Sequence, residues 1–298
     1  MSAAEASRRT GLAYALAAYL AWGLLPVYFR ALAPVPPLEI LSHRILWSVL
    51  LLAALVTLLR RWGEVARPLG NARGRWVLLA TTSLISVNWL VYIWAVHAGR
   101  VLEASLGYFV NPLVNVLLGV LFLREPLSRP QKVAVGVAAL GVAVLVLSAG
   151  RFPWVALVLA FSFGVYGLLR KKEQIEPVGG LFLETGLVAP LAAAWVLRLA
   201  RAGEGHFGGE ARLTLLLLAA GVVTALPLIW FALGVQRLRL STIGLLQYIA
   251  PSMQFSIAVF LFRERFTPAH GVAFACIWGS LGLYTWDALA RLRRAEAG

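Results

Sequence analysis

Amide and phenol side chains recur on two stretches of the chain that are otherwise apolar. Tyr108, Asn111 and Asn115 are spaced three and four residues apart, so on a helix they share one face. Gln247 and Gln254, seven residues apart, share a face in a second such stretch. These groups form hydrogen bonds without carrying charge. They can therefore bind a polar solute or join neighbouring helices, and spacing alone leaves both interpretations open.

A third apolar stretch carries Asn88 and Tyr92, four residues apart and therefore on one face of a helix. An amide beside an aromatic ring suits an amphipathic small molecule, because sites for such molecules are mostly apolar with a few polar anchors. We predict that seven residues line a substrate cavity: Asn88, Tyr92, Tyr108, Asn111, Asn115, Gln247 and Gln254.

Four ionisable residues lie inside or near the edges of apolar stretches: Glu39, His43, Arg44 and Glu184. Glu39 and His43 are four residues apart and could pair. Arg44 could reach the interface, meet a carboxylate or bind an anionic group. His43 and Glu184 are candidates for proton coupling, and the equally weighted alternative is a structural polar cluster.

The sequence lacks the residue patterns of common active sites. It contains no HExxH, no Walker-type glycine-rich loop, no G-x-S-x-G elbow and no Cys/His metal spacing. The single cysteine, Cys276, has no partner for an internal disulfide. We predict no catalytic residue, no metal site and no cofactor, and therefore a protein that is not an enzyme.

The composition is that of a membrane protein. Hydrophobic residues make up 60% of the 298 residues and charged residues only 13%, and the mean hydropathy is +0.81. A soluble domain carries about 25% charged residues. This excludes a soluble enzyme, a nucleic-acid-binding protein and a secreted module, although the net charge of +14 would otherwise suggest a nucleic-acid partner.

A helix needs about 20 apolar residues to cross a bilayer. We predict ten such stretches, at roughly 11–29, 39–59, 75–97, 102–123, 132–148, 152–170, 178–199, 213–234, 241–262 and 269–289. With the N-terminus in the cytoplasm, 18 of the 27 Lys and Arg residues fall on the inner side and eight on the outer side, and Arg44 lies inside a span. This bias predicts a multi-pass protein of the cytoplasmic (inner) membrane, with both termini in the cytoplasm.

The chain contains an internal repeat. An offset of 139 residues superposes Pro112 on Pro251 and Arg124-Glu125 on Arg263-Glu264, and an offset of 141 superposes His43 on Glu184. Each copy then holds five helices, and an odd number inverts the second copy in the membrane. We predict an all-α protein of ten transmembrane helices in two inverted repeats, 11–148 and 152–289, with cytoplasmic tails 1–10 and 290–298.

The repeated residues suggest mechanical roles. Pro112 and Pro251 each remove a backbone donor, so we predict that they act as hinges in bent helices. Arg124-Glu125 and Arg263-Glu264 are predicted end caps or gate salt bridges on opposite faces of the membrane.

The chain resembles the EamA domains of the drug/metabolite transporter superfamily over essentially its whole length. The resemblance lies in Phe122–Glu125, its echo Phe260–Glu264, and the stretches Pro37–Ser48, Asn88-Trp89 and Tyr108–Pro112; the last three are similar to the RarD branch, labelled "chloramphenicol-sensitive protein". It implies ten helices, with the third, fourth, eighth and ninth lining a central cavity beside the first and sixth. The fifth and tenth would act as scaffold.

We therefore predict a secondary transporter that moves small organic metabolites or drugs, outward, by alternating access, with proton coupling as a candidate mechanism. The alternatives are an integral-membrane enzyme acting on lipid-linked substrates and a non-transporting membrane partner or sensor. The expected partners are a small-molecule substrate and membrane lipids, with no nucleic acid. A homodimer could form through Ala275 and Gly279.

Overall fold

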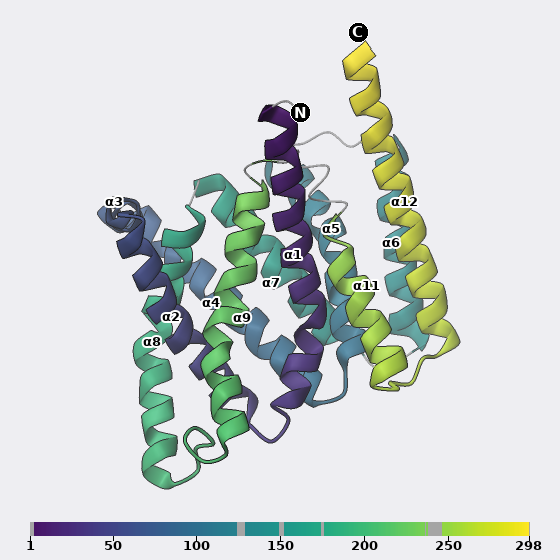
Figure 1. Cartoon of the computed structure of the whole chain (residues 1–298). Helices are drawn as coiled ribbons and strands as arrows, with labels where there is room; N and C mark the ends of the chain where they lie inside the picture. Colours follow the sequence, from purple (N-terminus) through teal and green to yellow (C-terminus); the bar gives the residue numbers. More distant parts are fainter. Residues whose placement is uncertain are drawn as a thin grey trace.

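The computed structural model describes residues 3–123, 129–148, 152–173, 176–235, 237 and 246–297, and within these residues all secondary structure is helical. The main helices (Figure 1) are α1 (Ala3–Ala31), α2 (Pro37–Leu58), α4 (Ala72–His97), α5 (Val101–Leu123), α6 (Arg129–Ser148), α7 (Trp154–Glu173), α8 (Pro177–Ala202), α9 (Ala211–Val235), α11 (Ile249–Ser256) and α12 (Pro268–Ala297). Three short elements are α3 (Trp62–Ala66), the 3-10 turn η1 (Arg67–Gly70) and the π-helical turn η2 (Ile257–Leu261).

Local sequence signals set where several helices begin and end. Pro177 occupies the first position of α8, where its missing N–H costs nothing, and the Glu176 carboxylate accepts a hydrogen bond from the first turn. Gly203 ends α8 in the left-handed conformation that glycine adopts without strain. The Asn71 side chain caps α4 in the same way as Glu176 caps α8.

Each of the ten predicted stretches overlaps one of these helices, although 241–262 lies within the described residues only from 246 onward. Five helical segments in the described part of the chain are long and apolar enough to cross a membrane: Arg9–Ala31, Pro37–Leu58, Ala72–His97, Val178–Ala202 and Ala211–Phe231. Trp154–Arg170 and Ile249–Leu261 are shorter apolar helices. The chain thus has the architecture of a multi-pass membrane protein.

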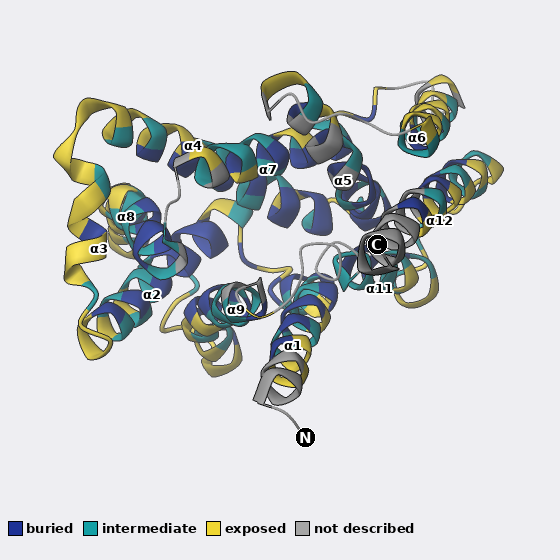
Figure 2. Ribbon diagram, turned by 90° about the horizontal axis from the view of Figure 1, so that it is seen from above, coloured by how far each residue is buried: buried dark blue, intermediate teal, exposed yellow. Residues whose placement is uncertain are grey.

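Eight helices form a closed ring, seen from above in Figure 2. Each packs against the next in the order α8, α4, α7, α5, α11, α1, α9, α2 and back to α8. The remaining long helices, α6 and α12, pack against each other at the edge of the ring beside α5. Residues of α2 that contact α1 or α4 therefore lie on the inner side of the ring.

Glycines allow the closest approaches between ring helices. A Cβ added at Gly221 of α9 would lie 2.6 Å from the backbone carbonyl carbon of Trp47 on α2. At Gly107 of α5 it would lie 2.7 Å from the carbonyl oxygen of Ala156 on α7. Small residues at such crossings are the usual means of packing helices in a membrane, where no hydrophobic effect separates buried from lipid-facing surface.

The two chain ends lie at the same end of the bundle (Figure 1). We call the opposite end the distal end. Helices α1 and α4 and the turn η2 finish there, and the connections 98–100, 203–210 and 262–267 run across it.

Candidate functional site

The side chain of Arg44 is buried inside the ring, with 5% of its surface exposed. Its guanidinium lies 5.2 Å from the ring centroid of Phe29 on α1 and 4.8 Å from that of Trp89 on α4. Its Nε donates a hydrogen bond to Thr224 Oγ1 of α9 at 2.9 Å. In the part of the chain that the structure describes, Arg44 forms no ion pair, so a carboxylate partner, one of its predicted roles, is not found there.

Two tyrosines continue this aromatic cluster. The Tyr92 ring lies 5.9 Å from Phe29 and 5.5 Å from Tyr108, measured between centroids. The Tyr108 hydroxyl donates to Asn88 Oδ1 at 3.4 Å. The hydroxyl of Tyr92, a side chain that is 2% exposed, has no hydrogen-bond partner among the described residues. We call Phe29, Arg44, Trp89, Tyr92 and Tyr108 the Arg44 cluster.

The predicted amides of α4 and α5 bond to α7. Asn88 Nδ2 donates to Leu159 O at 3.0 Å and to Ser162 Oγ at 2.9 Å. Asn111 Nδ2 donates to Ala160 O at 3.0 Å, and Gln247 Nε2 donates to Asn111 Oδ1 at 3.3 Å. These residues thus form two sets against α7: Asn88 with Tyr108, which Tyr92 joins through its ring, and Asn111 with Gln247. The amide donors of Asn88 and Asn111 bond a neighbouring helix, as the packing interpretation predicts.

Gln254 makes the corresponding bond in the other half of the ring. Its Nε2 donates to the carbonyl oxygen of Trp22 on α1 at 3.0 Å, while its Oε1 is buried with no partner among the described residues. Gln254 thus bonds a different helix from the one that Asn88 and Asn111 bond. Asn115 lies on α5, and its side chain is outside the described set.

The two prolines differ in their setting. Pro251 lies in the first turn of α11, directly after a turn at 247–248, and its carbonyl accepts a hydrogen bond from Ser105 Oγ at 2.8 Å. A proline in a first turn removes no intrahelical bond, so Pro251 marks the start of α11 and does not bend it from within. Pro112 lies within α5, and its side chain is outside the described set.

Glu39 does not hydrogen-bond His43, although their spacing allows a pair. Its carboxylate, 1% exposed, accepts a hydrogen bond from the backbone N–H of His206 at 2.8 Å and lies 2.8 Å from Nδ1 of the same residue. The His43 ring instead stacks on Phe207 at 5.0 Å between centroids, and both its nitrogens lack a partner in the described part of the chain. The connection between α8 and α9 therefore supplies a partner for each residue: His206 for Glu39 and Phe207 for His43.

Glu184 belongs to a separate ionic cluster. Its Oε2 lies 3.3 Å from Arg170 NH1 and accepts a hydrogen bond from Tyr166 at 3.0 Å. Helices α2 and α8 are antiparallel. Glu39, at the start of α2, bonds His206, which follows the end of α8, and Val65, which follows the end of α2, lies against Gly179 at the start of α8. His43, near the start of α2, and Glu184, near the start of α8, therefore lie toward opposite ends of this helix pair.

Glu264 caps a helix at the distal end. Its two carboxylate oxygens accept hydrogen bonds from the backbone N–H groups of Val101 (2.7 Å) and Leu102 (2.8 Å) at the start of α5. Burial raises the pKa of Glu264, while the two N–H donors and Arg30 act in the opposite direction. The preceding Arg263 has a φ of 54°, and Arg124 and Glu125 lie outside the described residues.

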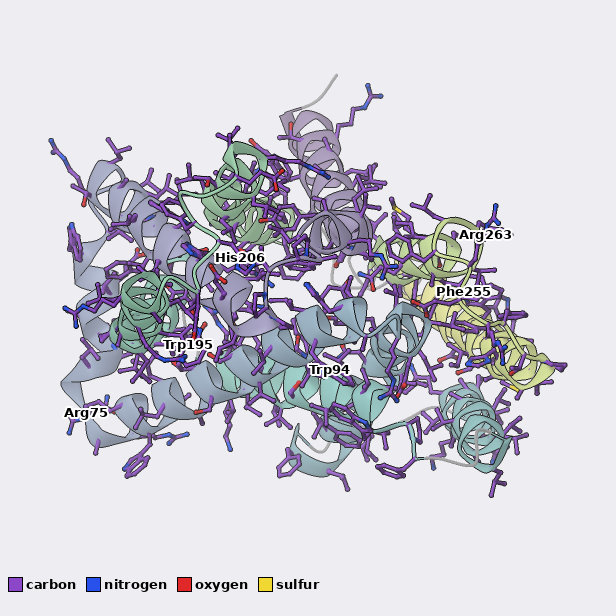
Figure 3. The ribbon with its side chains drawn as sticks, turned by 90° about the horizontal axis from the view of Figure 1, so that it is seen from below. Arg75, Trp94, Trp195, His206, Phe255 and Arg263 are labelled. Atoms are coloured by element: carbon purple, nitrogen blue, oxygen red, sulfur yellow. The ribbon has the colours of Figure 1, made fainter. Side chains whose placement is uncertain are left out.

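Several contacts at the distal end link segments that are far apart in sequence. Besides Glu264 and α5, the guanidinium of Arg30 lies 5.4 Å from the ring centroid of Phe262. Figure 3 views this end and places His206, the partner of Glu39, and Arg263 on opposite sides of it. Contacts between distant segments of the chain thus connect the helices of the ring at this end.

Removing the Glu264 carboxylate should loosen the start of α5. We expect Glu264→Ala to cost about 1 kcal/mol, because two N-terminal N–H groups lose their acceptor. Hydrogen exchange followed by mass spectrometry should show faster exchange at Val101 and Leu102. The control is Glu204→Ala, which removes an exposed carboxylate paired with Arg198 and should leave this exchange unchanged. Equal protection in wild type and Glu264→Ala would refute the cap.

Some partners carry no signal in the sequence. Phe29 and Ser162 are ordinary residues of apolar helices, and Arg170 reads as one of several cytoplasmic basic residues at a helix end. His206 stands in the longest polar connection, 167 residues from Glu39. Only the fold brings these residues to their partners.

Comparison with known proteins identifies the class. The model of the EamA-like transporter family matches residues 9–147. An "Uncharacterized transporter" of Vibrio cholerae is 46% identical to this chain over 97% of it and 96% of the relative. One solved structure, titled "Crystal structure of protein", superposes on this chain with a TM-score of 0.61 and 21% sequence identity. The match covers 94% of this chain and 97% of that one, so the two share a fold.

The chain belongs to the EamA-like transporter family, and it is therefore a multi-pass membrane protein of a transporter class. Within that family its relatives include RarD proteins. Protein RarD of Escherichia coli (strain K12) is 42% identical over 97% of this chain and 98% of the relative. "Chloramphenicol-sensitive protein RarD" of Pseudomonas aeruginosa is 33% identical over 96% of this chain and 97% of the relative. The predicted resemblance to the RarD branch is confirmed.

Proposed function

We propose that this protein is a secondary transporter of small organic molecules, built from inverted repeats 11–148 and 152–289 that alternate access to a central site. The order of the ring carries the proposal. The repeat relates α1 to α7, α2 to α8, α4 to α9 and α5 to α11, and this exchange converts α8-α4-α7-α5 into α2-α9-α1-α11, the other half of the ring. Every ring contact thus has its counterpart.

The hydrogen bonds and the family match support the same repeat. Asn111 of α5 donates to a carbonyl of α7, and Gln254 of α11 donates to a carbonyl of α1, which is the equivalent pairing. The family model matches 9–147, close to the bounds of the first proposed repeat. Two equivalent halves around one site are the expected basis of alternating access.

The proposed topology has ten spans, with both termini in the cytoplasm and the protein in the inner membrane. The positions of the chain ends at one end of the bundle (Figure 1) and the excess of Lys and Arg predicted at that end support it. The distal end is then the outer face. Its contacts, Glu264 with α5 and Glu39 with His206, each join residues of different repeats and would act as the outer gate, with Arg263 beside Glu264.

The central site in this proposal is formed by Asn88, Tyr92, Tyr108, Asn111 and Gln247, with Asn115 and Gln254 as further proposed lining residues. The break before Pro251 and the π-helical turn after α11 support a hinge in that half, with Pro112 as its counterpart. Outward movement of the solute, coupling to protons through His43 or Glu184, and a homodimer are further parts of the proposal.

The test is uptake of labelled solutes into inside-out vesicles, with and without an imposed proton gradient. We expect saturable uptake by wild type and loss of about 90% of it in Tyr108→Ala/Gln247→Ala, because both side chains belong to the proposed central site. The control is Trp286→Ala, which removes an exposed aromatic ring on α12. Uptake that is equal in both variants would refute the proposed site, and gradient-independent uptake would refute proton coupling.

A further inference from the structure

An arginine inside a membrane span needs a compensating group, and the described part of the chain supplies none to Arg44. The side chain has five N–H donors. One is used on Thr224, and in the described residues the two terminal nitrogens form neither a hydrogen bond nor an ion pair. Glu39, the acidic residue of α2, is bonded to His206. A buried charge of this kind is costly and marks a functional site by default.

The surroundings of Arg44 hold the guanidinium in place without neutralising it. The rings of Phe29 and Trp89 contact the guanidinium, and Thr224 fixes its Nε. The hydroxyls of Tyr28, Tyr92 and Tyr108 lie within electrostatic range of the charge. The guanidinium is therefore held in a fixed position, while its two terminal nitrogens have no hydrogen-bond partner among the described residues.

The edge of the guanidinium that carries these nitrogens has the geometry that a carboxylate needs. Two parallel N–H donors from a guanidinium match the two oxygens of a carboxylate, and such paired bonds are among the strongest hydrogen bonds in proteins. The Tyr92 hydroxyl, buried and without a partner in the described residues, supplies a further donor within the cluster. The surrounding aromatic rings provide apolar surface for the rest of a ligand.

We infer that the Arg44 cluster is the binding site for the carboxylate of a small organic anion with an apolar, preferably aromatic, body. In the described residues no acidic side chain faces the cluster, so an ammonium group on the same ligand would remain uncompensated. The site therefore favours a simple carboxylate over a zwitterionic amino acid. This inference deepens the proposed function by naming the class of its substrate, and it can be tested by binding alone.

The experiment measures thermal unfolding of the full-length protein in detergent while benzoate is titrated, because a ligand of the folded state raises its melting temperature. Benzamide, phenylalanine and inorganic phosphate serve as the neutral, zwitterionic and inorganic probes. We expect stabilisation by benzoate alone. A shift by benzamide equal to that by benzoate would overturn the inference, as would stronger stabilisation by phenylalanine or by phosphate.

The variants locate the site. We expect Arg44→Gln to weaken benzoate binding about tenfold or more and Arg44→Lys, which keeps the charge but loses the paired donors, to weaken it less. Tyr92→Phe keeps the ring and should weaken binding about threefold, which provides a test if Arg44→Gln does not fold. The control is Arg198→Gln, because Arg198 also packs on a tryptophan, at 4.7 Å, but is exposed. Unchanged binding in the three cluster variants would refute the site.

Transport of benzoate in proteoliposomes separates this inference from the proposed function. Binding that depends on Arg44 without flux of any solute would support the anion site and refute the transporter. Flux of other solutes together with benzoate binding that is unchanged in Arg44→Gln would support the transporter and refute the anion site.

Discussion

Replacing Arg170 with methionine should destabilise the protein by about 3 kcal/mol or more. The change leaves Glu184, whose side chain has 0% exposure, without the guanidinium that lies 3.3 Å from it. Breaking a buried ion pair by removing one partner typically costs about 3–5 kcal/mol, because the remaining charge is uncompensated. Arg170 also donates to the carbonyl of Glu176 at 3.0 Å, and that bond would be lost too. Thermal and chemical unfolding in detergent measures the change.

Two matched variants test the cause. Arg170→Met/Glu184→Met removes both charges and should recover most of the lost stability, because well-packed apolar groups often replace a buried pair at little cost. Arg61→Met removes another arginine paired with a glutamate, Glu176, at 3.0 Å, but the Arg61 side chain is 40% exposed. It should cost less than about 1 kcal/mol. If Arg61→Met and Arg170→Met cost the same, burial of the pair is not the cause.

The same cluster decides between the two roles predicted for Glu184. If the carboxylate only holds α8 to α7, Glu184→Gln should lower stability and leave the response of transport to a proton gradient intact. If it carries the coupled proton, Glu184→Gln should abolish that response at permissive temperature. The ion pair with Arg170 and the distance of Glu184 from His43 along the helix pair support the structural role.

Hydropathy predicts the helices of this fold well, because a bilayer imposes nearly the same length on every span. The predicted spans beginning at 39 and 178 start within two residues of Pro37 and Pro177, the first residues of α2 and α8. Hydropathy does not predict the turn at 247–248 or the π-helical turn that follows α11, since both depend on how α11 packs against α1 and α5. The order of helices in the ring is equally hidden, because apolar faces toward lipid and toward protein look alike.

The sequence predicts those residues of the candidate site that share a face of one helix. Asn88 and Tyr92 do so on α4, and Tyr108 and Asn111 do so on α5, and the structure brings the two faces together. Spacing allows Glu39 and His43 to pair, but it cannot find the partner that the fold supplies, because sequence spacing recognises partners one turn apart and not a histidine in a distant connection. The sequence predicts that Arg44 is a buried polar residue. It does not predict the aromatic rings that contact Arg44, because these come from other helices.

The second large effect is expected from Gly221→Val, which fills the contact between α9 and α2. A Cβ at this position would already lie 2.6 Å from the carbonyl carbon of Trp47, so the helices must separate. Overpacking of a tight contact typically costs about 1–3 kcal/mol, and valine adds two further methyl groups. The displaced contact is backbone and cannot rotate away. We therefore expect a cost at the upper end of this range, measured as unfolding in detergent.

Two glycine controls separate this steric effect from helix propensity. Gly167→Ala, on an exposed face of α7 with nothing within 4 Å of the added Cβ, should be neutral or stabilising, because alanine favours helix by about 1 kcal/mol. Gly23→Ala, on α1, places its Cβ 2.7 Å from the Met253 sulfur and 2.9 Å from the Met253 Cβ. The flexible thioether can move aside, so only the Cβ contact requires a small shift of the helices. The expected order of stability is Gly167→Ala, Gly23→Ala, then Gly221→Val. A Gly221→Val protein as stable as Gly23→Ala would mean that α2 and α9 are less closely packed than the ring requires.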